Sequence, residues 1–244
     1  MRQLCFSQYV TASDYPPFAL VTLNQEIQST YYRILAKRAS FHVCADGGFD
    51  RLLHYCRSHN VPLSEIQPHV LVGDFDSISP TGLDAANRAG VRVEKVHCQD
   101  TTDFQKAIKV IERQASADFG QALPIIVFGA IDGRFDHTIA SISVLYEYPE
   151  YEIWLLSGIS LITLLPGGTN TIRLDFALEG PTCGILPLNG KCTTSSTGLK
   201  YELHDLDLEV GQLVSSSNSA ESERITITTD RPLAWTVQLN IFRH

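Results

Sequence analysis

The sequence predicts an α/β domain built on a parallel sheet, followed by an antiparallel all-β sandwich. Over the first two thirds of the chain, short apolar segments alternate with segments of helical periodicity. After Gly158 the helical periodicity is missing, and short strand-like segments follow one another between turns. The 244 residues are enough to bury two modest cores. We therefore expect the α/β domain over residues 1–158 and the sandwich over 159–244.

The predicted elements of the first domain alternate regularly. Apolar strands are expected at 18–23, 41–45, 70–72, 91–96, 125–128 and 152–156. Helices are expected at 29–38, at 49–56, from 79 onward, from about 102, and at about 135–146. The third of these helices has a clear start, because Ser79 suits an N-cap and Pro80 suits the first helical position. Short buried strands separated by helices are typical of a parallel sheet that is covered on both faces.

The second domain is predicted from short segments that glycine, proline and asparagine turns separate. Strands are expected at 161–165, 171–174, 183–186, 199–203, 213–216, 225–229 and 235–239. The polar segment 215–222 is interpreted as a loop. Trp154 and Trp235 lie in apolar or alternating segments, so we interpret both as core residues.

Composition argues against several classes of protein. A net charge of −8 argues against nucleic-acid binding, which needs a basic face. No apolar run approaches the ~20 residues of a membrane helix, and the first residues lack a secretory signal. The six cysteines form no Cys-x-x-Cys pair. We therefore expect reduced thiols in a cytoplasmic protein.

Aspartates and glycines follow four consecutive predicted strands. The segments are Ala45–Gly48, Gly73–Ser77, Asp100–Asp103 and Gly129–Asp136. The carboxyl ends of parallel strands meet at one edge of the sheet, where ligands bind. Taken singly, each acid has an ordinary explanation as a loop residue or a residue at a helix N-terminus. Converging aspartates repel one another, so their convergence predicts a cation site.

The residue types favour Mg²⁺ as that cation. Carboxylates without nearby histidine or cysteine suit hard cations. On extended backbone Asp74 and Asp76 project to one side, while Phe75 turns toward the core. A partial set of carboxylates leaves coordination sites for water and phosphate oxygens, as is usual for Mg²⁺ with a nucleotide. The cation would also shield a triphosphate from this acidic protein.

Basic residues and glycines near these acids could contact phosphate. Arg134 follows Gly133 at a predicted helix start, where its guanidinium could bind phosphate oxygens. Lys106 lies one turn after Thr102-Asp103, and Gly47-Gly48 could form a phosphate cradle at a helix N-terminus. Taken alone, each of these charges is more often a solvated surface residue. The Walker, dinucleotide, protein-kinase and Gly-x-Ser-x-Gly signatures are absent.

Four segments together resemble, in order and spacing, the motifs of thiamine pyrophosphokinases. They are Cys44–Gly48, Gly73–Ile78, Asp100–Phe104 and Gly133–His137. Weaker similarity continues through Leu165–Gly168, Cys183–Pro187, Thr197–Lys200 and Ser217-Asn218. The resemblance runs from about Leu20 to the C-terminus.

The resemblance implies a homodimer whose active site lies between the α/β domain of one subunit and the sandwich of its partner. Asp74, Asp76 and Asp103 would hold Mg²⁺, with Asp46 as a further ligand and Asp100 close by. The implied ATP contacts are Gln25, Asp46, Gly47, Gly48, Thr102, Lys106, Arg134 and Asp136. Ser217 and Asn218 would bind the aminopyrimidine of thiamine from the other subunit.

The implied reaction moves a pyrophosphoryl group from ATP to the hydroxyl of thiamine and releases AMP. Mg²⁺ and Arg134 would stabilise the oxygens as charge shifts. We favour Asp100 as the base because it is the carboxylate least needed as a ligand, with Asp74, Asp76 and Asp103 as the alternatives. Two other functions stay open: a Mg²⁺-dependent phospho- or nucleotidyltransferase for another small alcohol, and a non-catalytic nucleotide or thiamine sensor.

Overall fold

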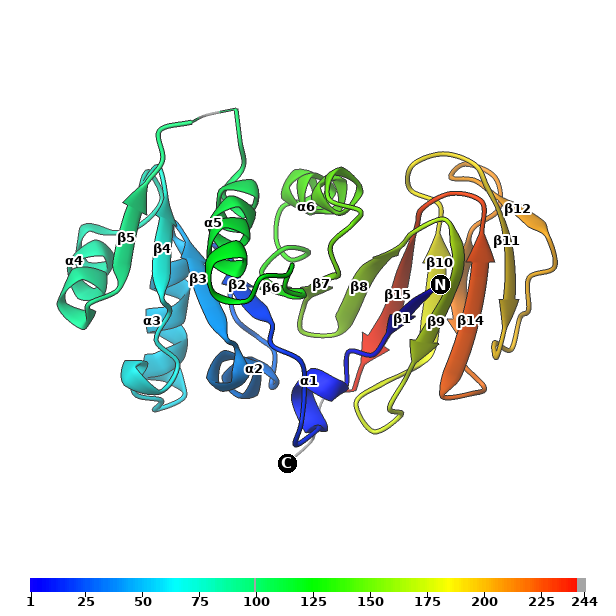
Figure 1. Cartoon of the computed structure of the whole chain (residues 1–244), viewed down its shortest axis with the longest axis horizontal. Helices are drawn as coiled ribbons and strands as arrows, with labels where there is room; N and C mark the ends of the chain where they lie inside the picture. The colour runs from blue at the N-terminus through cyan, green and yellow to red at the C-terminus, as the bar shows by residue number, and fades with distance from the viewer. Residues whose placement is uncertain (99, 241–244) are drawn as a thin grey trace. The chain divides into compact units, whose positions relative to one another are not determined.

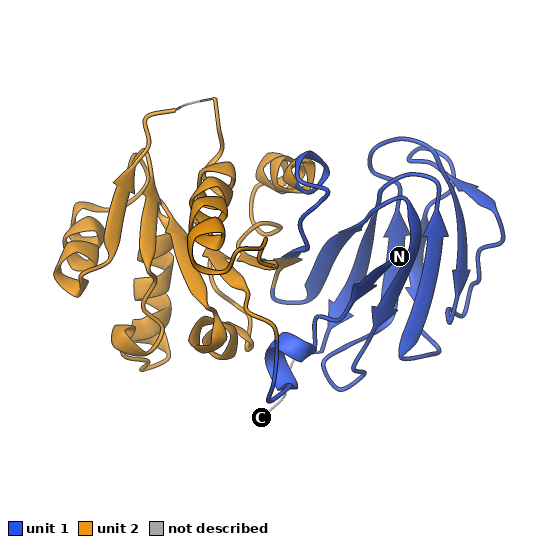
Figure 2. Cartoon of the chain, viewed as in Figure 1, with its two compact units in different colours: residues 1–15, 145–154, 158–244 blue, residues 16–144, 155–157 orange. Residues whose placement is uncertain are grey.

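The computed structural model describes residues 1–98 and 100–240 (Figure 1). The chain forms two compact units (Figure 2). The α/β unit comprises residues 16–144 and 155–157. The β unit comprises residues 1–15, 145–154 and 158–244. The two-part architecture that the sequence predicts, parallel α/β followed by β, is confirmed.

The α/β unit is built on parallel strands in the order β6-β2-β3-β4-β5. The strands are β2 (Ala19–Thr22), β3 (Phe41–Ala45), β4 (Val70–Gly73), β5 (Arg92–Lys95) and β6 (Ile125–Phe128). The helices are α2 (Tyr32–Arg38), α3 (Gly48–Ser58), α4 (Pro80–Ala89), α5 (Asp103–Asp118) and α6 (Phe135–Glu147), with a 3-10 turn at Leu63–Glu65. Strands β2, β3, β4 and β6 are buried along their whole length, as a sheet covered on both faces requires.

The strand register brings the carboxyl ends of the central strands level with one another. Thr22 lies opposite both Cys44 and Phe128, and Ala45 lies opposite Val72. Helices α3 and α5 both pack against β2 and β3, the strands at the centre of this order. The loops that follow β2, β3, β4 and β6 therefore leave the sheet along one edge.

Local sequence fixes where the helices beside that edge begin. Ser79 caps α4 by accepting the Gly82 N–H at 3.0 Å, and Pro80 is the first helical residue, as predicted. Thr102 and Gln105 form a capping box at the start of α5. The Thr102 hydroxyl accepts the Gln105 N–H at 3.2 Å, and the Gln105 side chain accepts the Thr102 N–H at 2.8 Å.

The β unit holds two sets of paired strands. One sheet has the order β1-β9-β14-β11-β12, and the other pairs in the order β13-β10-β15-β8. The strands are β1 (Arg2–Leu4), β8 (Ser160–Leu165), β9 (Gly168–Arg173), β10 (Glu179–Leu186), β11 (Cys192–Thr197), β12 (Leu206–Leu208), β13 (Ser215–Ser219), β14 (Arg224–Thr229) and β15 (Leu233–Leu239). A short helix α1 (Gln8–Thr11) follows β1, and both α6 and β7 (Ile153–Leu156) contain residues of each unit.

Several strands of the β unit depart from the predicted pattern. The predicted strand at 199–203 is absent from the structure apart from an isolated bridge between Leu199 and Ala220. Instead β11 forms at residues 192–197, where threonine and serine hide the period-two burial from a hydrophobicity pattern. Strand β13 at residues 215–219 overlaps the predicted strand at 213–216 and extends into the segment 215–222, predicted as a loop. Strand β1 pairs in parallel with β9, more than 160 residues away, which no local pattern predicts.

Both tryptophans are core residues, as predicted. Trp154 is 1% exposed and Trp235 is fully buried. The Trp154 indole N–H donates to Glu152 Oε1 at 2.7 Å, and its ring centroid lies 5.7 Å from that of Phe6. Both tryptophan rings therefore pack in the interior of the β unit.

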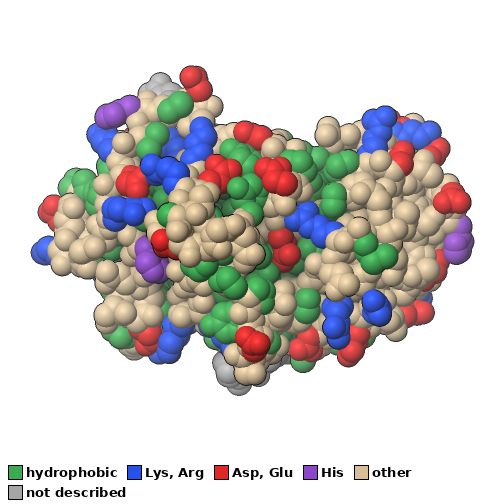
Figure 3. All heavy atoms as spheres, viewed as in Figure 1, with side chains coloured by type: hydrophobic (Ala, Val, Ile, Leu, Met, Phe, Trp, Pro, Cys, Tyr) green, Lys and Arg blue, Asp and Glu red, His purple; other side chains and the backbone are tan. Residues whose placement is uncertain are grey.

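One face of the molecule carries charges of both signs (Figure 3). On the face shown in Figure 3, acidic and basic side chains are interspersed, and no broad basic surface is visible there. Among the residues that the structure describes, no helix combines the length and the apolar character that crossing a bilayer requires.

One carboxylate of the β unit is buried without full compensation. Glu179 at the start of β10 is 1% exposed. Its Oε1 has no hydrogen-bond partner among the described residues. Burial raises the pKa of Glu179 from 4.5 to about 8, because the apolar surroundings disfavour the charged form. The folded protein therefore holds a proton that the unfolded chain releases.

This burial predicts a stability that falls with rising pH. Between pH 4.5 and about 8 the unfolded chain binds fewer protons at Glu179 than the folded chain, so the free energy of unfolding decreases across that window. The Glu179→Gln variant should lose this decrease and be more stable than the wild type at pH 8 by on the order of 3 kcal/mol. Urea denaturation at pH 5 and pH 8 measures the difference, with exposed Glu221→Gln as the control. An unchanged slope against pH in Glu179→Gln would contradict the assignment.

Candidate functional site

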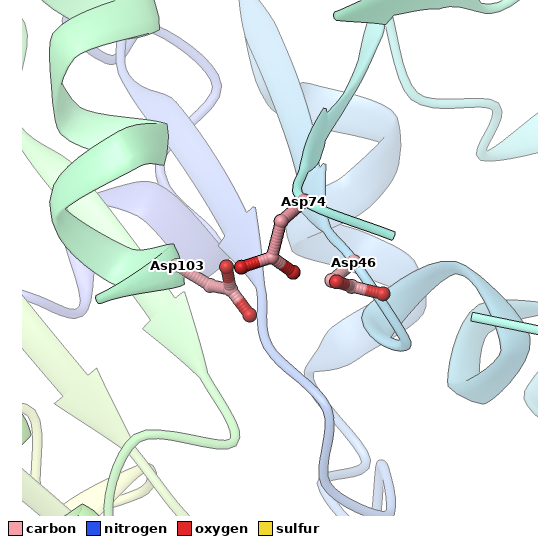
Figure 4. A group of neighbouring side chains, drawn as sticks. All are labelled: Asp46, Asp74 and Asp103. Atoms are coloured by element: carbon pink, nitrogen blue, oxygen red, sulfur yellow. The ribbon is translucent and has the colours of Figure 1, made fainter. Parts of the chain in front are cut away.

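Three aspartates meet at the carboxyl edge of the parallel sheet (Figure 4). Asp46 follows β3, Asp74 follows β4, and Asp103 is the first residue of α5. Each offers a carboxylate oxygen, and these oxygens lie within 4.8 Å of one another. The predicted convergence of acids thus forms a compact group of oxygen donors.

Asp46 holds the loop that follows β4. It is fully buried and has a left-handed backbone, with φ of 45°. Its Oδ2 accepts the Phe75 N–H at 3.0 Å, while Oδ1 accepts the N–H groups of Ser77 at 3.2 Å and Ile78 at 2.7 Å. Burial raises the pKa of Asp46, and Asp103 adds to the effect, although the backbone donors oppose it. The Asp46 side chain therefore fixes the backbone on which Asp74 and Asp76 are carried.

Lys106 joins the other two carboxylates. Its side chain is 3% exposed, and its Nζ lies 3.0 Å from Asp74 Oδ2 and 2.9 Å from Asp103 Oδ1. The hydrogen bond from Lys106 lowers the pKa of Asp74. Burial alone would lower the pKa of Lys106, but Asp103 and Asp74 together raise it. This ammonium group offsets part of the repulsion and orients both carboxylates toward each other.

The remaining predicted acids do not belong to this group of three. Asp76 is exposed, and one of its oxygens accepts the Ser77 hydroxyl at 2.8 Å. Asp100 is also exposed and stands next to residue 99, which lies outside the described residues. Arg134 pairs with Asp136, and both side chains are mostly exposed. That ion pair accounts for the raised pKa of Arg134 and the lowered pKa of Asp136.

A cavity of about 490 Å³ opens beside the aspartates. The loop after β2, α3, the loop after β4, and the starts of α5 and α6 line it. Its walls are Leu23, Asn24, Gln25, Arg51, Ser77, Thr102, Asp103, Phe104, Gly129, His137, Ala140 and Ser141. Gln25, Thr102 and Asp103 are among the residues that the sequence predicts for the site. The volume falls in the range of small-molecule pockets.

The two glycines of the predicted phosphate cradle permit close packing at the start of α3. A Cβ on Gly48 would lie 2.2 Å from the Thr22 carbonyl oxygen, and one on Gly47 would lie 2.4 Å from the Asn24 side chain. The glycines thus let the first turn of α3 contact the end of β2 and the loop after it. Neither glycine is part of the cavity wall.

Sequence reasoning missed several cavity residues. Arg51 lies in the first turns of α3, and its Nε donates to Asn24 Oδ1 at 2.8 Å. His137 lies at the start of α6, directly after the predicted Asp136. In the sequence, Arg51 could have been found only because it follows Gly47-Gly48 closely. Asn24 could have been found only because it directly follows a predicted buried strand.

The predicted thiamine contacts lie on β13 of the β unit. Asn218 is 2% exposed, and its Nδ2 donates to the Tyr201 carbonyl at 2.9 Å and to Ser215 Oγ at 3.0 Å. Its Oδ1 accepts the N–H groups of Tyr201 at 3.2 Å and Ser219 at 2.8 Å. Asn218 therefore holds the loop that presents exposed Tyr201. Ser217 has a left-handed backbone, with φ of 58°, and its side chain is exposed.

Both parts of the chain are similar to known proteins. Residues 32–155 match the family model described as thiamin pyrophosphokinase, catalytic domain, and residues 169–234 match thiamin pyrophosphokinase, vitamin B1 binding domain. The chain is 35% identical to thiamine pyrophosphokinase 1 of Oryza sativa subsp. japonica, over 94% of this chain and 93% of the relative. It is 36% identical to thiamine pyrophosphokinase 1 of Arabidopsis thaliana, over 91% and 86%.

A solved structure agrees with these sequence comparisons. The thiamin pyrophosphokinase from Candida albicans superimposes with a TM-score of 0.87 at 27% identity, covering 98% of this chain and 93% of that one.

The contacts of Asp46 predict a large effect on stability. Asp46→Ala leaves the buried N–H of Ile78 and the partly buried N–H groups of Phe75 and Ser77 without their acceptor. The free energy of unfolding should therefore fall by about 3 kcal/mol. Urea denaturation measures the loss, and exposed Asp84→Ala on α4 serves as the control. A loss no larger than that of the control would show that the loop does not depend on Asp46.

Proposed function

The chain belongs to the thiamine pyrophosphokinase family, and on that premise we propose that it transfers a pyrophosphoryl group from ATP to the hydroxyl of thiamine, giving thiamine diphosphate and AMP. The observation that carries the proposal is the convergence of Asp46, Asp74 and Asp103 beside the cavity. The match of residues 169–234 to a vitamin B1 binding domain favours thiamine over another small alcohol as acceptor. A non-catalytic sensor would keep the pocket but lose one or more of the metal ligands, and all the expected acids are present in this sequence.

The carboxylates suit Mg²⁺ as the metal. The donors are oxygens only, one fully buried and two partly exposed, and neither histidine nor cysteine belongs to the group. Such a partial oxygen set fits Mg²⁺ better than zinc or copper. Asp74 and Asp103 would hold the ion, with Asp46 and Asp76 as further ligands. Bound Mg²⁺ would neutralise charge on the phosphate oxygens during transfer.

Residues of the chain position the nucleotide next to these acids. The first turn of α5 lines the cavity through Thr102, Asp103 and Phe104, so the positive end of a 16-residue helix lies at the cavity wall. Asp46 keeps the loop after β4 in place, and Lys106 keeps Asp74 and Asp103 in one orientation. Gln25, Gly47, Gly48, Arg134 and Asp136 complete the proposed ATP contacts.

The acceptor and the assembly are proposed from the family. We assign ATP and Mg²⁺ to residues 1–158 and thiamine to residues 159–244, with exposed Ser217 contacting the aminopyrimidine and Asn218 holding this segment in place. Thiamine carries a positive charge, which an acidic protein of net charge −8 attracts. A homodimer in the cytoplasm, with each site completed by the partner subunit, is the arrangement we propose.

Product analysis with ATP, Mg²⁺ and thiamine tests the reaction and its metal site together. The wild type should form AMP and thiamine diphosphate in equal amounts. Asp74→Asn should lower the rate at least about 100-fold, because one carboxylate of the group is lost. ADP with thiamine monophosphate would contradict pyrophosphoryl transfer while keeping a kinase. Full activity in Asp74→Asn would contradict the metal site.

The assignment of Asp100 as base yields a separate prediction. Asp100→Asn should lower kcat by about 100-fold, which is typical for loss of a general base. The Kd for ATP should stay unchanged, because Asp100 stands outside the group of three carboxylates. Steady-state kinetics and equilibrium ATP binding measure the two quantities. Unchanged kcat would leave Asp74, Asp76 or Asp103 as the base, and an equal loss in both quantities would point to a role in binding.

A further inference from the structure

Arg51 is the cation of the cavity wall. Among the twelve described residues that line the cavity, it is the one lysine or arginine. Lys106, which pairs with Asp74 and Asp103, and Arg134, which pairs with Asp136, do not line the cavity. A nucleotide in this cavity therefore meets the positive charge of Arg51.

Among the described residues, the Arg51 side chain has a hydrogen-bond partner but no acidic partner that would neutralise its charge. Its Nε donates to Asn24 Oδ1 at 2.8 Å, a neutral acceptor. Within the described part of the chain Arg51 takes part in no ion pair closer than 4.0 Å. The adjacent acid, Asp50, accepts the N–H of Ser79 at 2.6 Å and its hydroxyl at 2.9 Å. In a chain of net charge −8, a cation without an acidic partner is free to bind an anion.

Gly47 allows this arrangement. A Cβ at Gly47 would lie 2.4 Å from the Asn24 Nδ2, so the amide fits against the start of α3 because residue 47 is glycine. The loop after β2 and the helix after β3 are thus joined through Asn24 and Arg51. Gly47 therefore contributes to the position of Arg51 through Asn24.

The other walls define the anion. The α5 N-terminus and Ser77 favour phosphate, and Asp103 belongs to the carboxylate group that suits a divalent cation. Leu23, Phe104 and Ala140 add apolar surface that suits a nucleobase or ribose. A nucleoside di- or triphosphate matches these walls, because it has several negative charges, binds a divalent cation and carries an apolar base.

We infer that Arg51, oriented by Asn24, binds phosphate oxygens of the nucleotide in this cavity. The inference deepens the proposed function, since it names the group that grips the donor substrate. Arg51 is the binding residue and Asn24 is a positioning residue that acts through it. The terminal amino groups of Arg51 offer the phosphate up to four N–H donors, because Asn24 takes only the Nε–H.

Equilibrium binding of ATP with Mg²⁺, measured by calorimetry without thiamine, tests the inference. Arg51→Gln should raise the Kd about 10- to 100-fold, and Arg51→Lys should recover only part of the affinity because it keeps the charge but loses the planar donors. Arg57→Gln, an exposed arginine in the last turn of the same helix, is the matched control and should leave the Kd unchanged. The thermal midpoints of all these variants should match the wild type, since both arginine side chains are exposed.

Asn24 is tested through a double mutant. Asn24→Ala should raise the Kd about 3- to 10-fold, and adding it to Arg51→Gln should cause no further loss, because Asn24 acts through Arg51. An Arg51→Gln Kd equal to that of the wild type would overturn the inference. Additive losses in the double mutant would overturn the positioning role of Asn24.

The same samples separate this inference from the proposed function. If the wild type turns over thiamine but Arg51→Gln binds ATP normally, the inference fails and the proposed function stands. If the wild type binds ATP through Arg51 but forms no thiamine diphosphate, the inference stands and the proposed acceptor fails.

Discussion

Repulsion among the carboxylates of Asp46, Asp74 and Asp103, held within 4.8 Å of one another, is the constraint that the edge of the parallel sheet has to satisfy. The fold offsets it in two ways. Backbone N–H groups of the loop after β4 bind both oxygens of Asp46, and the buried Nζ of Lys106 lies between Asp74 and Asp103. The ammonium neutralises one charge of the group, so a net negative charge remains to attract a divalent cation.

The same constraint links stability to function. The Asp46 carboxylate binds the backbone of the loop after β4 and also belongs to the proposed metal site. One residue therefore both holds the backbone that carries Asp74 and adds negative charge that attracts the cation. Such a site is rigid before any ligand binds, because its ligands are fixed by hydrogen bonds already present in the folded chain. Preorganisation of this kind is what phosphoryl transfer needs, since positioning and charge neutralisation supply most of the rate enhancement.

The cavity next to the acids adds positive charge and apolar surface to the site. Arg51 and the first turn of α5 bring positive potential to a wall that otherwise continues an acidic group, and Leu23 and Phe104 bring apolar surface. Opposite charges on neighbouring walls suit an anion that arrives together with its cation. In the β unit the Asn218 amide is hydrogen-bonded to the backbone of Tyr201 and holds that loop in place. The surface that this loop offers a ligand therefore consists of backbone groups and the exposed Tyr201 ring.

The amino-acid sequence by itself determined the parallel α/β half, because buried apolar strands and amphipathic helices differ in period, and local capping at Ser79 and Thr102 marks the helix starts. It also predicted that acids from four segments would converge, since parallel strands bring their carboxyl ends to one edge, and Asp46, Asp74 and Asp103 are the ones that meet. Only the tertiary structure decided which charges pair. Lys106 binds Asp74, which lies 32 positions away, as well as Asp103 in its own helix, and the Arg51 guanidinium donates to an amide 27 positions away. Strands β1 and β11 escaped prediction for the same reason: their burial comes from partners distant in sequence, and a pattern of nearby residues carries no information about contacts made across the fold.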